Sequence, residues 1–345
     1  MLMDHLAKKM EYSGEQIPLK QIHDEKEDKK KSVTVVEYFK TALSLFWERR
    51  YLLLVVLGAF FNALRTLLSK VVLFHIDPVM TGWTERTTMM ICCVPAILWY
   101  RLSLRTTVSL TAALLVTGVL SAAQIILIMT SYKYLNVGDA GAIISCNPII
   151  IGILAWIFLS EKLRPVDLLS CVVAVLGVML LSRPSEIFDG SAFLLSNLML
   201  GFTAAIGGAF SIAIGGVLKR LLCIKEVNKH VSLLYVNFIG ALICSIICTI
   251  LEKWQLPNTI TASVFLVLSG ICGYLNNLMI MIALCHEKAY HVFVVNTSSV
   301  AMVYMLQYIF LHVSPDIYST VGSTCVILSV VLISRTKTEN TEEED

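Results

Sequence analysis

The stretch VMLLSR at residues 178–183 returns as VVLISR at residues 330–335, and this repetition predicts how the whole chain folds. A second pair, WIFL at residues 156–159 and YIFL at residues 308–311, recurs at the same spacing of 152 residues. Chance matches between apolar stretches need not share one spacing. The two pairs together therefore indicate that the second half of the chain repeats the first.

The composition indicates lipid rather than water as the main solvent of the chain. Of the 345 residues, 57% are hydrophobic and 15% are charged, and the mean hydropathy is +0.76. Soluble domains carry about 25% charged residues. We therefore expect an all-α polytopic membrane protein, with the lipid bilayer as a partner and no nucleic acid.

Apolar runs of membrane-spanning length divide the chain into ten segments. A helix needs about 20 mainly apolar residues to cross the hydrocarbon core. The boundary between the third and fourth runs is the least distinct, because only residues 134–139 separate them. The ten expected transmembrane helices are residues 51–73, 78–100, 109–132, 137–160, 165–183, 192–217, 230–252, 259–285, 290–312 and 316–335.

The repeat divides these ten spans into two sets of five. An odd number of spans reverses the direction of the chain, so the second five-helix repeat, residues 184–335, is inverted relative to the first, residues 51–183. Inverted repeats are typical of secondary transporters, whose two halves alternate around a central site. The pattern therefore favours transport of a small-molecule solute by alternating access.

The loop charges predict that both termini are cytoplasmic. Cytoplasmic loops of membrane proteins carry an excess of Lys and Arg. With the N-terminus inside, the outer loops hold Lys133, Arg183 and Lys253. The inner loops hold the larger set of Arg101, Arg105, Lys162, Arg164, Lys219, Arg220, Lys225, Lys229 and Lys288. The plasma membrane and the Golgi or endoplasmic reticulum both stay open.

Three segments lie outside the expected spans. Residues 1–34 are polar and indicate a disordered cytoplasmic tail, and residues 336–345 form an acidic cytoplasmic tail. Residues 35–50 have apolar positions near helical spacing and end in Trp47 and two arginines. They predict an amphipathic helix on the membrane interface, with an extension of the first span as the alternative.

A continuous set of motifs in the first half resembles a known family. It comprises YKYLNVGDAGAII at residues 132–144, Asn147-Pro148, FLSEKL at residues 158–163 and GVMLL at residues 177–181. This order resembles the EamA-type repeat of the drug/metabolite transporter superfamily, and within it the G-type branch of solute carrier family 35. The second half departs from the pattern, with His312-Val313 at the acid–base pair and no Asn-Pro in the ninth span. The resemblance implies ten helices in two inverted repeats and substrates that range from nucleotide sugars to drugs.

Charged residues inside the spans are candidates for the substrate site, because a charge at membrane depth usually faces a cavity or a partner. Arg65 and Glu85 lie roughly 12 Å and 10 Å from the outer ends of neighbouring helices at about 1.5 Å per residue. They are expected to meet, either as a structural pair or as part of a gate. Arg86 is a third candidate, whereas Lys70 is expected to reach the interface. The excess of bases suits an anion such as a carboxylate or a nucleotide sugar.

Uncharged polar residues add a second group of candidates. Pro148 removes a backbone donor in the fourth span and predicts a helix break. The binding or gating residues expected around a central cavity are Gln124, Asn147, Asn276, Asn277 and Asn296, together with the charged Arg65, Glu85 and Arg86. Helices one, two, three, four, eight and nine are expected to build this site.

Other function classes leave little trace in the sequence. No phosphate-binding glycine loop, zinc motif or nucleophile elbow occurs, so we expect no enzyme, no cofactor and no metal. The ten cysteines predict apolar packing rather than disulfides, with Cys223 placed in a loop. The alternative to a transporter is a receptor, sensor or scaffold on a transporter-like fold, and a homodimer stays open.

Overall fold

The computed structural model describes residues 50–73, 76–104, 106–135, 137–161, 164–182, 195–254, 259–311 and 321–332. Within these ranges the regular structure is α-helical, with no strand. The expected tails at residues 1–34 and 336–345, and the interfacial helix at residues 35–50 except for Arg50, lie outside the described residues.

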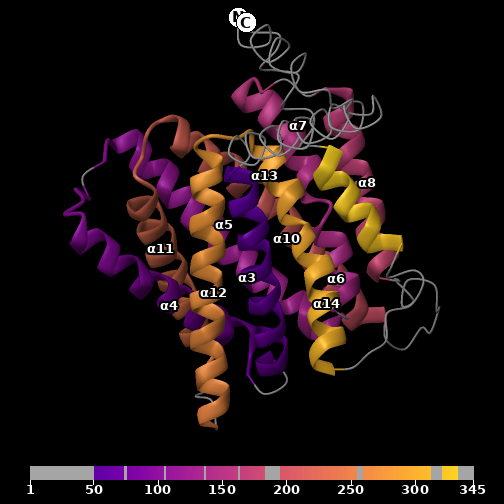
Figure 1. Cartoon of the computed structure of the whole chain (residues 1–345). Coiled ribbons are helices and arrows are strands. Elements are labelled where there is room, and N and C mark those ends of the chain that lie inside the picture. The colour runs from indigo at the N-terminus through magenta and orange to yellow at the C-terminus, as the bar shows by residue number, and fades with distance from the viewer. Residues whose placement is uncertain are drawn as a thin grey trace, which may run out of the picture. The chain divides into compact units, whose positions relative to one another are not determined.

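Each of the ten expected spans contains helix (Figure 1). The fourth span is two helices, α6 (Val137–Ile144) and α7 (Asn147–Leu159), and so is the ninth, with α13 (Ala289–Asn296) and α14 (Ser298–Leu311). The tenth is helical over residues 321–332. The others are α3 (Arg50–Leu73), α4 (Pro78–Trp99), α5 (Val108–Tyr134), α8 (Pro165–Ser182), α10 (Leu195–Ile224), α11 (Lys229–Ile250) and α12 (Ile260–Leu284).

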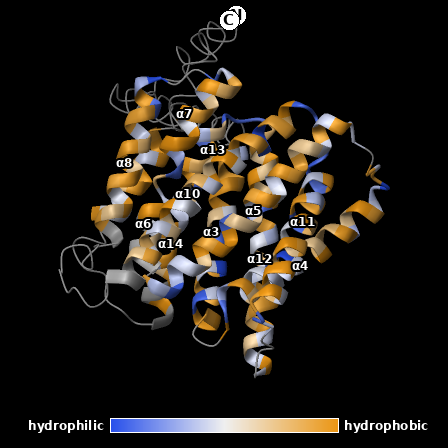
Figure 2. Cartoon of the chain, turned by 180° about the vertical axis from the view of Figure 1, so that it is seen from behind, coloured by the Kyte–Doolittle hydropathy of each residue, from blue (hydrophilic) through white to orange (hydrophobic). Residues whose placement is uncertain are grey.

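The prediction of an all-α polytopic protein with about ten spans is confirmed. By length and composition, 6 of the described helical stretches can cross a membrane. Others are shorter apolar helices, such as α7 and α8. Many large apolar residues of these helices are exposed, and hydrophobic residues, coloured orange, predominate along the helices in Figure 2. Such a surface suits hydrocarbon, where helices satisfy their own backbone polar groups.

Side chains at the helix ends explain where several helices begin. Asp77 caps α4 by accepting a hydrogen bond of 3.2 Å from the Val79 N–H, and proline follows at the first helical position. Asn228 caps α11 by accepting from the His230 N–H at 3.0 Å. Short polar side chains are favoured at such caps because the first N–H groups of a helix have no intrahelical partner.

The end of α10 differs from the sequence expectation. Lys219, Arg220 and Cys223, which were assigned to an inner loop, lie inside this helix. The apolar pair Leu221-Leu222 continues the helix, which ends at Ile224. Beyond it, Glu226 has a positive φ of 56° and the Val227 N–H returns to the Leu222 carbonyl at 3.0 Å. The basic side chains of Lys219 and Arg220 therefore project from the helix within the bundle and not from the loop.

The helices of the two expected repeats interleave. The second-repeat helix α11 packs on α4 and α5, and α12 packs on α4. Likewise α10 packs on α5 and α7, while α13 packs on α7. Two of these contacts, α4 with α11 and α7 with α13, join spans at equivalent places in the two repeats. The described residues from Tyr51 onward accordingly form one compact unit.

One glycine allows the fifth and tenth spans to touch. A Cβ at Gly177 of α8 would lie 2.8 Å from the Gly322 carbonyl oxygen, which belongs to the helix at residues 321–332. We expect Gly177→Ala to lower the stability by about 1–3 kcal/mol, because the two backbones must separate. The melting temperature of the purified protein measures this. Gly215→Ala is the control, since nothing lies within 4 Å of its Cβ position, and equal melting temperatures would contradict the prediction.

Candidate functional site

Two helix breaks lie at equivalent places in the two repeats. The fourth span is interrupted at Ser145 and Cys146, between α6 and α7. The ninth span is interrupted at Thr297, between α13 and α14. The step from Ser145 to Thr297 is 152 residues, the spacing found in the sequence repeat. Each repeat therefore carries a broken helix at the same position.

The first break follows from Asn147 and Pro148. Pro148 has no N–H, so the carbonyl of Ile144, four residues earlier, loses its helical donor. The Asn147 side-chain Nδ2 donates to this carbonyl at 2.7 Å. The side chain thus replaces the missing backbone bond, and its Oδ1 has no hydrogen-bond partner among the described residues. The expected break at Pro148 is present.

The second break has no proline, and a side-chain hydroxyl competes for the helix carbonyls there instead. The Thr297 Oγ1 donates to the Val294 carbonyl at 2.6 Å, and its N–H is shared between the carbonyls of Phe293 and Val294 at 3.1 Å each. A side-chain hydroxyl that competes for a helix carbonyl bends or opens the helix. All residues from Ala289 to Val295 are buried, so protein rather than lipid surrounds this irregular backbone.

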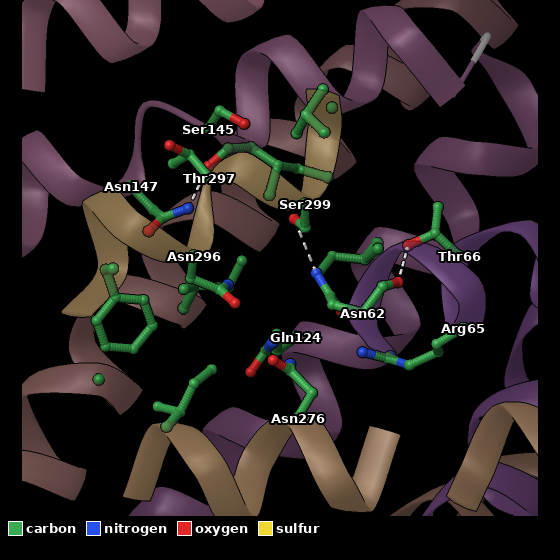
Figure 3. Close-up of a pocket in the computed structure, with 18 of the residues that line it drawn as sticks. Asn62, Arg65, Thr66, Gln124, Ser145, Asn147, Asn276, Asn296, Thr297 and Ser299 are labelled. Carbon is green, nitrogen blue, oxygen red and sulfur yellow. Dashed lines mark hydrogen bonds between the residues drawn. The ribbon is translucent and has the colours of Figure 1, made fainter. Parts of the chain in front are cut away.

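The breaks border a cavity between the repeats (Figure 3). It holds about 1170 Å³ of space, including solvent at its opening. Its walls come from the first, third and fourth spans of each repeat, which are α3, α5, α6–α7, α10, α12 and α13–α14. The sequence expectation included the second span and omitted the sixth. Among the lining residues that the structure describes, α4 contributes none and α10 contributes Lys219.

The repeat spacing relates opposite walls of the cavity. Shifting Gln124 by 152 residues gives Asn276, and shifting Asn147 gives Ser299; all four line the cavity. The same shift relates further lining residues, namely Ile128 to Ile280, Gly141 to Phe293, Ile144 to Asn296 and Ser145 to Thr297. The two repeats therefore present matching positions to one space.

Arg65 and Glu85 meet, as their depths suggested, but they have different surroundings. The Arg65 Nε donates to the Glu85 Oε2 at 2.9 Å, and Arg65 also lines the cavity. Glu85 is fully buried behind it and accepts from the Ser69 hydroxyl at 2.6 Å, with the Ser269 hydroxyl at 3.3 Å. No hydrogen bond joins the two Arg65 Nη atoms to the described residues, so they remain available towards the cavity.

Arg86 and Lys70 lie outside the lining. Arg86 is buried and donates to the Asn237 Oδ1 at 3.1 Å and to the Ser121 carbonyl at 2.8 Å. It therefore connects α4 with α5 and α11 rather than facing a solute. Lys70 donates to the Tyr132 carbonyl at 2.7 Å. Of the eight residues singled out in the sequence, six line the cavity, and Glu85 and Arg86 do not.

Lys219 is the second cation of the cavity, and the sequence reasoning missed it. It projects from α10 and donates to the Asn277 Oδ1 at 3.0 Å. The Asn277 Nδ2 donates to the Gly273 carbonyl at 2.9 Å, so both ends of this amide are hydrogen-bonded. The repeat spacing offered a signal, because it relates Lys219 to Leu67, two residues from Arg65.

Several polar residues of the lining also went unrecognised in the sequence. Asn62 of α3 donates to the Ser299 hydroxyl of α14 at 3.2 Å and thereby joins the two repeats across the cavity. Such short polar side chains are common in membrane helices, and only the packing selects the ones that face the cavity. The others are Thr66, Tyr132, Ser145, Thr297 and Tyr304.

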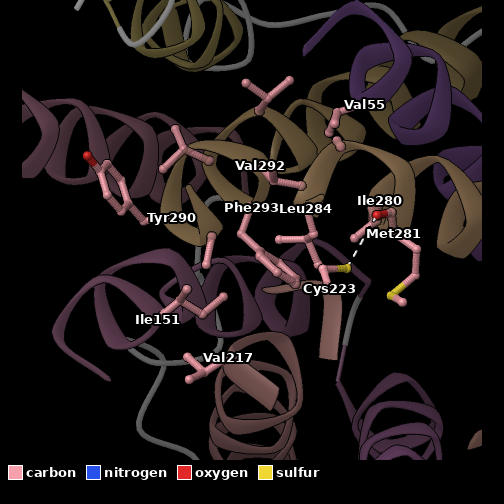
Figure 4. Close-up of a cluster of buried hydrophobic side chains, with 14 of the residues drawn as sticks. Val55, Ile151, Val217, Cys223, Ile280, Met281, Leu284, Tyr290, Val292 and Phe293 are labelled. Carbon is pink, nitrogen blue, oxygen red and sulfur yellow. Dashed lines mark hydrogen bonds between the residues drawn. The ribbon is translucent and has the colours of Figure 1, made fainter. Parts of the chain in front are cut away.

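An apolar cluster adjoins the cavity, and Figure 4 shows part of it. Ile280 and Phe293 belong both to the cavity wall and to this cluster. The cluster continues along α12 to Leu284, along α10 to Cys223, and along α13 to Tyr290. These residues mark the face at which α7, α10 and α12 end and α8 and α13 begin, and we call it the latch face.

Polar contacts join the two repeats at the latch face. The Arg220 Nε of α10 donates to the Glu161 Oε1 at 2.8 Å, and its Nη1 donates to the Leu284 carbonyl. The Glu161 Oε2 accepts the Ala289 N–H at 3.2 Å. Glu161 follows α7, whereas its partners belong to the second repeat. Charge-assisted bonds of this kind are stronger than neutral ones, so they tie the two repeats together at this face.

A second contact at the latch face involves the first turn of α8. The buried Asp167 accepts from the Tyr290 hydroxyl at 2.6 Å, and the His291 Nε2 lies 3.3 Å from its other carboxylate oxygen. It also accepts the Arg164 N–H at 3.0 Å. The start of α8 is thereby fixed to the start of α13.

The described residues hold no group of three or more His, Cys, Asp or Glu side chains placed to bind a metal ion. All ten cysteines are free thiols, and Cys223, expected in a loop, is buried in α10. The cavity therefore offers cations, amides and hydroxyls, which suit reversible binding of a polar solute.

Comparison with known proteins agrees with this architecture. The model of the EamA-like transporter family matches residues 49–183 and 199–335. Solute carrier family 35 member G1 of Homo sapiens is 32% identical over 222 residues, which cover 63% of this chain and 60% of that protein. The matched part is thus less than two thirds of this relative. The sequence resemblance to EamA-type transporters and solute carrier family 35 is confirmed.

One further relative and one solved structure are similar to this chain at lower sequence identity. The pseudopaline exporter CntI of Pseudomonas aeruginosa is 21% identical over 224 residues, covering 65% of this chain and 75% of the exporter. A solved structure titled "Crystal structure of protein" has a TM-score of 0.68 at 16% identity, covering 81% of this chain and 94% of its own, and shares the fold. This chain belongs to the EamA-like transporter family and is a multi-pass integral membrane protein.

Proposed function

We propose that the protein is a secondary-active transporter that carries a small organic anion by alternating access. The observation that carries this proposal is the cavity between the repeats, whose walls come from matching spans. A site at the repeat interface, beside broken helices, is typical of secondary transporters. One chain supplies both halves of the cavity, so the mechanism does not require a homodimer.

The charge of the cavity supports an anionic solute. Arg65 and Lys219 line it, and no carboxylate occurs among the described lining residues. Glu85 offsets the charge of Arg65 from behind, which leaves Lys219 as the uncompensated cation. A carboxylate or phosphate group between them would form charge-assisted hydrogen bonds in a site of low dielectric constant.

The relatives support export or uptake rather than signalling. One relative of this chain is named as an exporter and another as a solute carrier.

We assign the latch face to the cytoplasmic side, in agreement with the excess of Lys and Arg in the loops there. At the opposite face, Asp77 lies 3.6 Å from Lys253 and 4.0 Å from Lys133. The latch face and the opposite face therefore each have their own ion pairs, which must break when that face opens.

Removal of the cavity cations tests the proposal. We expect Lys219→Gln to reduce saturable uptake of labelled carboxylates and phosphate esters into liposomes by roughly tenfold or more, because the variant loses one buried charge-assisted contact with the solute. The control is Lys225→Gln, which should transport normally because its exposed side chain lies just beyond the end of α10. Uptake of neutral or cationic solutes alone would reject the anion, and silence across the panel would favour a receptor or scaffold.

Arg65 needs a paired experiment, because its removal leaves Glu85 buried without a partner. We expect Arg65→Gln with Glu85→Gln to yield folded protein that does not take up anions, since the cation facing the cavity is gone. Size-exclusion chromatography checks folding and liposome uptake checks transport. Full uptake by the charge-swapped variant Arg65→Glu with Glu85→Arg would mean that the pair is purely structural.

Opening of the latch face is a further prediction. We expect Arg220→Gln to remove the ion pair with Glu161 and so to favour opening of the latch face. The rate of maleimide labelling of the buried Cys223 should rise by about tenfold, because losing about 1.4 kcal/mol of stabilisation raises the opening equilibrium constant by that factor. Mass spectrometry of the labelled protein measures this. The exposed Cys285 is the internal control. If Cys223 stays as protected as in the wild type, the Arg220 contacts do not close this face.

A further inference from the structure

Two cysteines from different helices meet at the latch face. Cys223 lies in the last turn of α10, and Cys285 lies just past the end of α12. The Cys223 Sγ lies 3.7 Å from the Met281 carbonyl oxygen, as Figure 4 shows, and the Cys285 Sγ lies 3.2 Å from the same oxygen. The two thiols are also hydrogen-bond partners of each other. The fold therefore places side by side two thiols that are far apart in the sequence.

The two thiols differ in their exposure. Of the ten cysteines, all of which the structure describes, Cys285 alone is exposed, whereas Cys223 is buried in the apolar cluster. Apolar packing explains a buried thiol but not an exposed one. Both cysteines line one surface groove, together with Ile224 and residues 226–229. A small polar reagent that enters this groove therefore reaches the exposed thiol first.

The surroundings of Cys285 favour its thiolate, which is the nucleophilic form of a cysteine. The hydrogen bond from Cys223 holds the pKa of the Cys285 thiol below its usual value and outweighs the opposing effect of partial burial. The positive charges of Lys229 and Arg220 lower this pKa further. Lys229 lines the same groove, and Arg220 donates to the carbonyl of Leu284. An accessible thiolate beside a second thiol is the arrangement found in cysteines that respond to oxidants.

We propose that Cys223 and Cys285 form a redox-active dithiol, which a hydroperoxide converts into a disulfide between α10 and α12. The Cys285 thiolate first attacks one peroxide oxygen. An S–O bond forms, the O–O bond breaks, and the other oxygen takes up a proton and leaves as an alcohol, or as water when the oxidant is hydrogen peroxide. The Cys223 sulfur then attacks the Cys285 sulfur. An S–S bond forms, the S–O bond breaks, and hydroxide leaves as water with the Cys223 proton. The two electrons that the sulfurs lose reduce the peroxide.

The modification is reversible on the cytoplasmic side, to which we assign the latch face. Cytosolic thiols such as glutathione reduce disulfides, so a disulfide formed there is transient and reports the presence of an oxidant. Arg220 already joins the two helix ends by its bond to the Leu284 carbonyl, and the disulfide adds a covalent connection beside it. The inference goes beyond the proposed function and does not depend on it, because the product is detected on the protein itself.

Peptide mapping of the purified full-length protein tests the proposal. Reduced protein is treated with hydrogen peroxide, its remaining thiols are blocked with N-ethylmaleimide, and the digest is analysed by mass spectrometry without reduction. We expect one cross-linked pair of peptides that joins Cys223 to Cys285 and that dithiothreitol separates. Cys244 and Cys248, one turn apart on α11 and fully buried, are the internal control and should stay reduced.

Two variants separate the roles of the thiols. In Cys223→Ser we expect the oxidation of Cys285 to stop at the sulfenic acid, which dimedone traps, because no second thiol attacks it. In Cys285→Ser we expect no oxidation of Cys223 under the same conditions, since the exposed thiol is gone. Cys272→Ser, on the same helix α12, is the matched control and should form the disulfide as the wild type does.

Three results would overturn the proposal. A disulfide between two copies through Cys285, seen as a dimer on a gel without reductant, would mean that Cys223 is out of reach. A sulfinic acid at Cys285 with Cys223 still reduced would mean the same. Retention of both thiols, under a peroxide treatment that oxidises the free amino acid cysteine, would mean that the pair is not reactive. None of these results depends on transport, so they are distinguishable from a failure of the proposed function, which is a lack of anion uptake.

Discussion

Hydrocarbon offers no hydrogen-bond partner to the backbone, so every backbone polar group within the membrane must be satisfied by the protein itself. A membrane helix can be broken only where protein surrounds the break. In the fourth span the carbonyl left open by Pro148 is satisfied by Asn147, and in the ninth span α13 is buried on all sides. Both breaks therefore lie inside the bundle, where irregular backbone and polar side chains together border a cavity.

The repeat makes this cavity two-sided. One spacing relates residues of opposite walls, and the first helix of each repeat brings one cation, Arg65 from α3 and Lys219 from α10.

Different contacts join the two repeats at the two ends of the cavity. At the latch face an apolar cluster and the bonds of Glu161 and Asp167 connect the repeats. Towards the other face, Glu85 connects Arg65 of the first repeat with Ser269 of the second. The proposed alternating access requires these two sets of contacts to break one at a time.

Side-chain direction accounts for the candidates that sequence reasoning placed less well. Glu85 and Arg86 are neighbours on α4, and depth alone does not tell which side of that helix faces a cavity. Packing turns Glu85 towards Arg65 and Arg86 towards Asn237, so neither lines the cavity. Lys219 was assigned to a loop because charges usually end a span. The helix continues past it to Ile224, and Leu222 within that last stretch is fully buried.

The ten spans, their helical character and the first of the two helix breaks follow from the sequence alone. Apolar length predicts the spans, the 152-residue spacing predicts two repeats with opposite direction, and Pro148 predicts a break, because these are local or periodic properties. The tertiary structure, in contrast, sets which spans border the cavity, with the sixth in place of the second. It alone brought Asn62 to Ser299 and left Asn147 and Asn296 each with an unpaired oxygen. Those features depend on how helices rotate and interleave, which contacts between distant segments set and no single segment encodes.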